Sequence, residues 1–152
     1  MNLSKLSTEV ISLTLEVGEF IRNEALVFDR QKVEYKGLHD MVSYVDKTAE
    51  QRLVKALSIL LPEAGFVTEE KTSTVKGEKY NWIIDPLDGT TNFIHGIPTF
   101  SVSIALQCDN ELVLGVVYEI NRDECFSAWK NGGAYLNNKR ISVSKAPTSV
   151  AS

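Results

Sequence analysis

Hydrophobic residues recur every three or four positions through the first part of the chain, which is the repeat of one face of an α-helix. Polar and charged residues fill the positions between them, so the expected helix is amphipathic. We predict that this helix spans residues 3–27. Its apolar face is formed by Leu3, Leu6, Val10, Leu13, Val17, Phe20 and Ile21.

A polar stretch, DRQKVEYKGLHD, follows this helix, and we expect a hairpin or a mobile loop there with Gly37 as its flexible point. Ser43, with Asp46 three residues later, resembles a capping box and predicts that a second helix begins at this point. Pro62 is expected to end that helix. Its apolar face is formed by Val45, Ala49, Leu53, Leu57 and Leu60.

Beyond the second helix the hydrophobic period changes to two, which is typical of β-strands. The separators CDNE, NRDE, KNGG and LNNK are short and rich in turn residues, so neighbouring strands are expected to be antiparallel. We therefore predict an α+β fold with two long helices packed on a largely antiparallel sheet. The strand candidates span residues 65–70, 80–85, 100–107, 112–120, 124–130 and 139–144.

The composition excludes several classes of protein. The 152 residues are 43% hydrophobic and 24% charged, which suits one globular domain with a substantial core. The apolar runs are much shorter than a membrane span, and the N-terminus has no apolar segment typical of a secretory signal. A net charge of −4 without a basic stripe argues against nucleic-acid binding. Cys108 and Cys125 lack metal-ligand spacing, so we expect free thiols and a cytoplasmic location.

Acidic residues gather where two strand candidates end. Asp85 and Asp88 lie in the segment WIIDPLDGTTNF, residues 82–93, and adjacent strands can bring Glu69 close to Asp85. Two carboxylates about 4 Å apart repel by about 4 kcal/mol at an effective dielectric constant of about 20. The segment IDPLDGTTNF contains no lysine or arginine that would offset this repulsion. A bound cation is therefore expected, and oxygen ligands without His or Cys favour Mg²⁺ over zinc.

The glycine and threonines of the same segment predict an anion site. Gly89 lets the backbone approach a ligand closely. If a helix begins at TTNF, the N–H groups of Gly89 and Thr90 are available to a phosphate group. An acidic metal-binding pair beside a phosphate-binding turn indicates metal-assisted hydrolysis of a phosphate ester. The alternative is that the Asp-Pro and Asp-Gly pairs only form turns, but the twelve-residue combination favours the site.

Several segments resemble the inositol monophosphatase family of Mg²⁺-dependent, lithium-sensitive phosphatases. They are TEE at residues 68–70, WIIDPLDGTTNF at 82–93 and HGIPTFSVSIAL at 95–106, and DMVSYVDKTAE at 40–50 fits the upstream aspartate segment of the family. The resemblance implies a layered αβαβα sugar-phosphatase fold. It also implies that residues 1–152 are its N-terminal, metal-binding α+β half, and that a C-terminal α/β half is absent from this chain.

The resemblance assigns metal ligands by position. Glu69 and Asp85 would hold a first Mg²⁺ together with the backbone carbonyl of Leu87. Asp85 would bridge to a second ion shared with Asp88, whose remaining ligand would come from the absent half. Glu69 would also touch a third, largely hydrated ion. Glu70 is the alternative to Glu69 as the direct ligand.

The resemblance also implies catalytic and substrate-binding roles. Thr90 and Asp46 would orient and deprotonate a metal-activated water molecule that attacks phosphorus, with Glu69 as the third member of the catalytic group. The N–H groups of Gly89 and Thr90 would hold the phosphate. The implied substrate-binding set is Glu69, Leu87, Asp88, Gly89 and Thr90.

The expected function is that of a Mg²⁺-dependent phosphomonoesterase acting on a small inositol or sugar phosphate, a homodimer when full length. Two alternatives share the fold, a 3'(2'),5'-bisphosphate nucleotidase and a fructose-1,6-bisphosphatase. A third alternative is a non-catalytic module that binds metal or phosphate. The presence of both Asp46 and Thr90 argues against it, because water activation, unlike binding, needs them. The 152-residue chain alone is expected to be weakly active or inactive.

Overall fold

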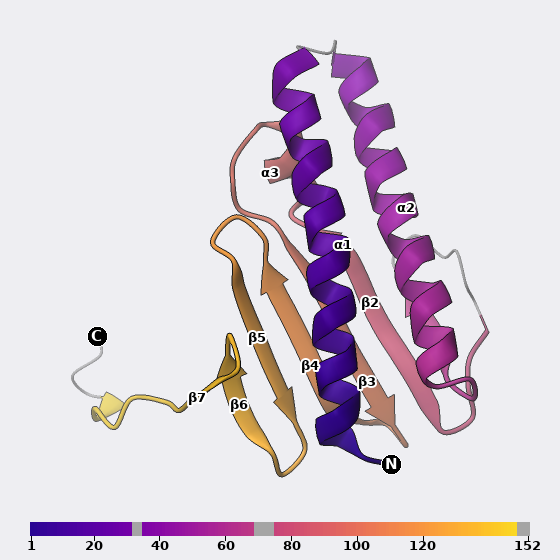
Figure 1. Cartoon of the computed structure of the whole chain (residues 1–152), viewed down its shortest axis with the longest axis vertical. Coiled ribbons are helices and arrows are strands. Elements are labelled where there is room, and N and C mark those ends of the chain that lie inside the picture. Colours follow the sequence, from indigo (N-terminus) through magenta and orange to yellow (C-terminus); the bar gives the residue numbers. More distant parts are fainter. Residues whose placement is uncertain (32–34, 69–74, 149–152) are drawn as a thin grey trace.

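The computed structural model describes residues 1–31, 35–68 and 75–148, with side chains described for residues 1–27, 37–68 and 75–148. Figure 1 shows two long helices lying along one sheet, with a short helix beyond the end of strand β2. The helices are α1 (Leu3–Gln31), α2 (Tyr35–Leu60) and α3 (Thr90–Ile94). The strands are β1 (Gly65–Thr68), β2 (Tyr80–Asp88), β3 (Ser101–Cys108), β4 (Glu111–Glu119), β5 (Glu124–Trp129), β6 (Gly133–Leu136) and β7 (Lys139–Ile141).

The strands of the described chain form one seven-stranded sheet in sequence order, β1 to β7. Strand β1 pairs in parallel with β2, and every later neighbour is antiparallel. The predicted α+β class with a largely antiparallel sheet is therefore confirmed. Short turns suffice for the antiparallel pairs, whereas the parallel pair needs the longer connection between residues 68 and 80.

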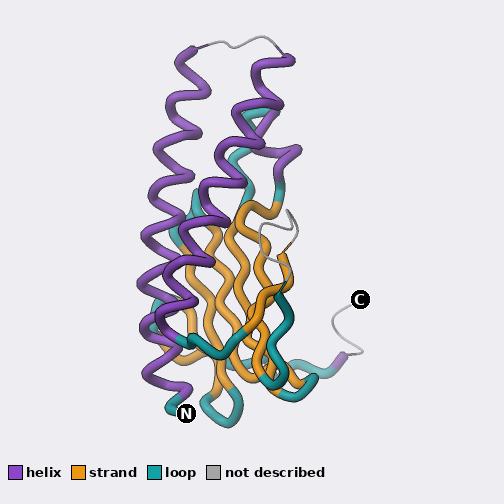
Figure 2. The backbone as a smooth tube through the Cα atoms, turned by 90° about the vertical axis from the view of Figure 1, so that its right-hand side faces the viewer, coloured by secondary structure: helices purple, strands orange, loops and turns teal. Residues whose placement is uncertain are grey.

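Both long helices cover the same face of the sheet, as the side view in Figure 2 shows. Helix α1 packs on β3, β4 and β5, and α2 packs on β2 and on α3. Alternate strand residues point toward the helices and are buried, such as Trp82, Ile104 and Val116 at 0–1% exposure. Close packing is helped by Gly18 of α1, because a Cβ atom there would lie 2.4 Å from the Tyr118 ring. None of the described helices has the length and apolar character needed to cross a membrane.

The start of the second helix differs from the sequence prediction. Helix α2 begins at Tyr35, so the capping box predicted at Ser43 and Asp46 is wrong, and the segment expected to be a loop is helical from Tyr35 onward. The helical face continues upstream because Leu38 packs on the core and Val42 is buried. The end of the helix at Leu60, two residues before Pro62, agrees with the prediction.

The strand predictions differ from the structure by more than one residue in three places. Strand β7 ends at Ile141, whereas the predicted strand continues to residue 144. Strand β6 is not predicted, because Gly133 and Leu136 at its ends belong to the separators KNGG and LNNK, which leaves only two residues between them to show alternation. Strand β2 continues beyond residue 85 to Asp88, through Pro86. A proline within a strand removes one ladder hydrogen bond, and it is tolerated here because the pairing with β3 is irregular at this position.

The sheet face opposite the helices is apolar in its centre. Val117 of β4 and Phe126 of β5 are cross-strand partners on this face, and they are 41% and 40% exposed. Beside them a row of small residues crosses four strands, so the face is hollowed, with a cavity of about 270 Å³ next to Phe126. A Cβ atom built on Gly115 would meet no atom within 4 Å. The row consists of Ala105, Gly115, Ala128 and Ala134, which are successive register partners.

Candidate functional site

The candidate site is built on the end of strand β2, where the pairing with β3 shifts register. Asp85 lies opposite Ser103 and Asp88 lies opposite Ser101, so β2 carries one extra residue over this interval. In a regular strand, residues three positions apart point to opposite faces. Because Ser101 and Ser103 are two apart and share a face, the extra residue places Asp85 and Asp88 on one side of the sheet. The two predicted metal-binding aspartates therefore share one face of the sheet.

Gly89 turns the chain from β2 into α3. Its φ of 100° and ψ of 37° lie in the left-handed region, which glycine adopts without strain. Steric crowding also favours glycine here, because a Cβ atom at this position would lie 3.0 Å from the Thr99 carbonyl oxygen and 3.2 Å from Phe100 Cβ. The condition set for the anion site, a helix that begins at TTNF, is met, since α3 starts at Thr90. Thr90 is therefore the first helical residue after a turn that only glycine fits well.

Helix α3 has only five residues and is held in place by its side chains. Phe93 is 4% exposed, and its ring meets the ring of Phe100 edge to face with centroids 5.1 Å apart. Asn92 Nδ2 donates a 2.8 Å hydrogen bond to the carbonyl oxygen of Thr99. These contacts join α3 to the segment that enters β3. The position of Thr90 is therefore fixed relative to β2, which precedes α3, and to β3.

The third part of the site comes from α2. Asp46 is 5% exposed, so it lies on the buried side of α2, the helix that packs on α1, β2 and α3. A carboxylate rarely occupies such a position in an ordinary amphipathic helix, because burying a charge is costly without polar partners. Asp46 therefore lies inside the helix on its buried face, and the capping role inferred from sequence does not apply.

Glu50 is a buried carboxylate that sequence reasoning did not single out. It lies one helical turn after Asp46 and has 0% exposure. The signal was present in the sequence, because position 50 falls on the same helical stripe as Asp46 and Leu53. Two acidic residues on the buried stripe of one helix are unusual, and they mark this part of α2 as more than a packing surface.

Glu69 and Glu70, the predicted ligands at the end of β1, lie outside the described residues. The last described residue of β1, Thr68, pairs with Ile84, which immediately precedes Asp85. The described carboxylates by themselves include no cluster of three or more acidic, His or Cys side chains arranged to hold a metal ion. The described donor groups are oxygen atoms, from Asp85, Asp88 and the Leu87 carbonyl, and this chemistry fits Mg²⁺.

Other residues in and near the segment 82–95 have structural roles. Trp82 and Phe93 belong to the core, with 0% and 4% exposure. His95 is exposed and follows the last residue of α3, where its backbone N–H donates to the Thr91 carbonyl oxygen. Cys108 and Cys125 are free thiols, which agrees with the prediction.

Nearly the whole chain is similar to proteins named inositol monophosphatase, both in sequence and in structure. The chain is 39% identical to an inositol-1-monophosphatase of Mesorhizobium japonicum over 94% of its own length and 54% of the relative. It is 38% identical to a protein of Aquifex aeolicus named fructose-1,6-bisphosphatase/inositol-1-monophosphatase, covering 93% of this chain and 54% of that protein. The structure of an inositol monophosphatase from Anabaena sp. PCC 7120 superimposes with a TM-score of 0.80 at 28% identity, over 96% of this chain and 52% of the other.

The chain thus spans about half the length of the relatives it matches. The likeness nevertheless extends through nearly all of the chain rather than only the motif around Asp85. The sequence pattern of the inositol monophosphatase family matches residues 2–152. The chain therefore belongs to the inositol monophosphatase family.

Proposed function

We propose that this chain is the N-terminal half of a Mg²⁺-dependent phosphomonoesterase that hydrolyses a small inositol or sugar phosphate. The observation that carries the proposal is the bulge in β2. It places Asp85 and Asp88 on one side of the sheet, directly before a left-handed Gly89 and the start of α3. Two carboxylates beside the backbone N–H groups of Gly89 and Thr90 suit the binding of a cation and a phosphate group together.

Mg²⁺ would be held by Glu69, Asp85, Asp88 and the Leu87 carbonyl oxygen. When bound, it would offset the repulsion among these groups and supply Lewis-acid stabilisation of the phosphoryl oxygens. The identity of the ion rests on the all-oxygen donor set and on family membership.

Residues of this chain would also bind the phosphate group and orient the attacking water molecule. The N–H groups of Gly89 and Thr90 would bind the phosphate oxygens and hold phosphorus in position. The Thr90 hydroxyl and the Asp46 carboxylate would orient the attacking water molecule, and Asp46 would take up its proton. Burial of Asp46 supports this assignment, because a side chain packed inside the protein is held in one position.

We further propose that a C-terminal half covers the apolar face of the sheet centred on Val117 and Phe126. The family relatives have about twice the length of this chain, and the two long helices cover only the other face. A second layer would bury Phe126 and fill the hollow at Gly115.

The same C-terminal half would complete the second metal site beside Asp88. The longer protein is proposed to be a cytoplasmic, lithium-sensitive homodimer.

The test compares Mg²⁺-dependent phosphate release by two proteins at equal concentration. One is the 152-residue chain, and the other is an extended protein in which residues 1–152 are joined to the C-terminal half of the Mesorhizobium relative. We expect turnover in the extended protein and at least a 100-fold lower rate in the chain alone, because electrostatic contributions of this kind are each worth about 10²–10³ in rate. Near-equal turnover would overturn the role given to the second half.

A second candidate function is hydrolysis of fructose 1,6-bisphosphate, and the name of the Aquifex relative favours including it. The phosphate-release assay should therefore present inositol phosphates, sugar phosphates, fructose 1,6-bisphosphate and adenosine 3',5'-bisphosphate to the extended protein. Phosphate binding without release from any substrate would favour the non-catalytic alternative.

A further inference from the structure

Thr68 is the last described residue of β1, and its hydroxyl is unusual. The Oγ1 atom is buried and has no hydrogen-bond partner among the described residues. A buried hydroxyl without an acceptor destabilises a fold, whereas a valine of nearly the same shape would avoid the cost. The retention of a hydroxyl at this position indicates that Thr68 forms a hydrogen bond with a bound ligand.

The location of Thr68 indicates where that group would lie. Thr68 pairs with Ile84, one residue before Asp85, so it adjoins the end of β2 that carries the site. It shares the strand face of Phe66, which is 6% exposed and faces the helices. Helix α2, which carries the buried Asp46, packs on that side of β2. Thr68 thus lies on the face of the sheet that is covered by α2, the helix that carries Asp46. Asp85 and Asp88 lie on the opposite face.

An unsatisfied hydroxyl by itself is not evidence of a site, as Ser7 shows. Its Oγ atom is also buried and without a hydrogen-bond partner in the described chain, but Ser7 lies near the N-terminus of α1. That end of α1 is at the opposite end of the molecule from α3 (Figure 1). The two hydroxyls are therefore a matched pair, one beside the candidate site and one remote from it.

We propose that Thr68 is a positioning residue of the site and that its hydroxyl donates a hydrogen bond to an oxygen atom that arrives with the ligands. This oxygen belongs either to a water molecule that accompanies the divalent cation or to the phosphate group. The inference rests on the proposed function, since it requires that the site binds a cation and phosphate. It adds a donor on the side of Asp46, where it would fix the oxygen that Asp46 and Thr90 also contact.

The experiment measures the melting temperature and the apparent Kd for Mg²⁺ alone and for inorganic phosphate in the presence of Mg²⁺. The variants are Thr68→Val, Thr68→Ser and the remote control Ser7→Ala. Without ligand, Thr68→Val should melt at or above the wild-type temperature, because it removes an unsatisfied polar atom. With ligand, it should bind roughly 2- to 10-fold more weakly, the range given by one neutral hydrogen bond. Thr68→Ser and Ser7→Ala should bind as the wild type does.

The two ligand arms separate the two sources of the oxygen. Weaker binding of Mg²⁺ alone by Thr68→Val assigns the oxygen to a water molecule of the cation, and weaker binding only of phosphate assigns it to the phosphate group. Unchanged affinity of Thr68→Val in both arms overturns the inference while leaving the proposed function intact. A wild-type chain that responds to neither ligand overturns both.

Discussion

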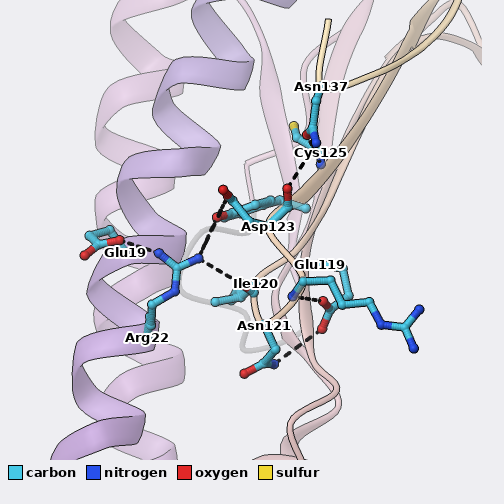
Figure 3. A network of polar contacts seen from close by, with 10 residues as sticks. Glu19, Arg22, Glu119, Ile120, Asn121, Asp123, Cys125 and Asn137 are labelled. Atoms are coloured by element: carbon cyan, nitrogen blue, oxygen red, sulfur yellow. Dashed lines mark hydrogen bonds and ion pairs between the residues drawn. The ribbon is translucent and has the colours of Figure 1, made fainter. Parts of the chain in front are cut away.

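Arg22 of α1 and Tyr118 of β4 are joined by a 2.8 Å hydrogen bond from Arg22 Nη2 to the Tyr118 hydroxyl, across 96 positions of sequence. Figure 3 shows the network around this contact. The same Nη2 atom donates to the Ile120 carbonyl oxygen at 2.7 Å, and the Tyr118 hydroxyl donates to Asp123 Oδ1 at 2.6 Å. The contact ties the helix layer to the turn that joins β4 and β5.

Removing the Tyr118 hydroxyl should destabilise the fold. Tyr118 is 2% exposed, and Tyr118→Phe would leave the guanidinium of Arg22 and the carboxylate of Asp123 without this bridge. We expect a loss of about 1–2 kcal/mol in the free energy of unfolding, since part of the network is open to solvent. Urea unfolding measures it. The control is Tyr44→Phe at an exposed position of α2, and an equal effect in both variants would contradict the role of the network.

Alkaline pH should weaken the fold through Cys125. Burial raises the pKa of the Cys125 thiol from 9.0 to about 11, and the charge of Asp123 adds to the shift. The folded protein holds this proton more tightly than the unfolded chain does, so the thiol's contribution to stability is complete below pH 9 and is lost between pH 9 and about 11. Burial and the Asp123 hydrogen bond also raise the pKa of Tyr118 above 10.0, which extends the loss at higher pH.

Urea unfolding under reducing conditions from pH 7 to pH 11 measures this dependence. Cys125→Ala should reduce the fall in stability between pH 9 and 11, whereas Cys108→Ala should retain it, because Cys108 is only partly buried. A slope that is the same in both variants would show that the Cys125 thiol does not titrate in the way described.

Mg²⁺ should stabilise the chain through Asp85. At a concentration 100-fold above Kd, a ligand that binds only the folded state adds about 2.7 kcal/mol to stability. Asp85→Asn should remove most of this rise, because it deletes the charge that pairs with the cation. Asp109→Asn makes the same change of charge at the β3–β4 turn and should leave the rise intact. If Mg²⁺ stabilises Asp85→Asn as much as it stabilises the wild type, Asp85 is not a ligand of the ion.

Thr90 should matter to the chemical step more than to binding. In the extended protein, Thr90→Ala should lower kcat by at least about 100-fold while KM stays within a few-fold, as expected for an interaction made mainly in the transition state. Its neighbour Thr91 is exposed on α3, so Thr91→Ala is the matched control. A raised KM with normal kcat would instead assign Thr90 to holding the phosphate.

The apolar sheet face should make the 152-residue chain self-associate. Exposed apolar surface that is contiguous favours association, and Phe126 lies at its centre beside Val117. Phe126→Glu should shift the chain toward monomer in sedimentation experiments. Ile59→Glu places the same charge on α2, where Ile59 is 73% exposed, and should not change association. A monomeric wild-type chain would contradict this use of the face.

Several features followed from local sequence because a local cause determines them. The apolar stripe of α1 predicted its buried face, and Val10, Val17 and Ile21 are 0–1% exposed. The turn at Gly89 followed in the same way, since the left-handed backbone there favours glycine whatever the rest of the fold does. The strands with clear alternation were identified for the same reason, with boundaries in error by a few residues.

What the sequence by itself determined is the class of fold, the identity of most elements and the residue types of the site. Tertiary structure alone decided that α2 begins at Tyr35 and that residues 133–136 pair as β6. The helical stripe placed Asp46 and Glu50 near the apolar face of α2, but only the tertiary structure decided that both are buried. It also decided that Asp85 and Asp88 share a side of the sheet, through a register shift against Ser103 and Ser101. The reason is physical: periodicity reflects burial along one element, whereas register, burial of a charge and the start of a packed helix depend on partners distant in sequence.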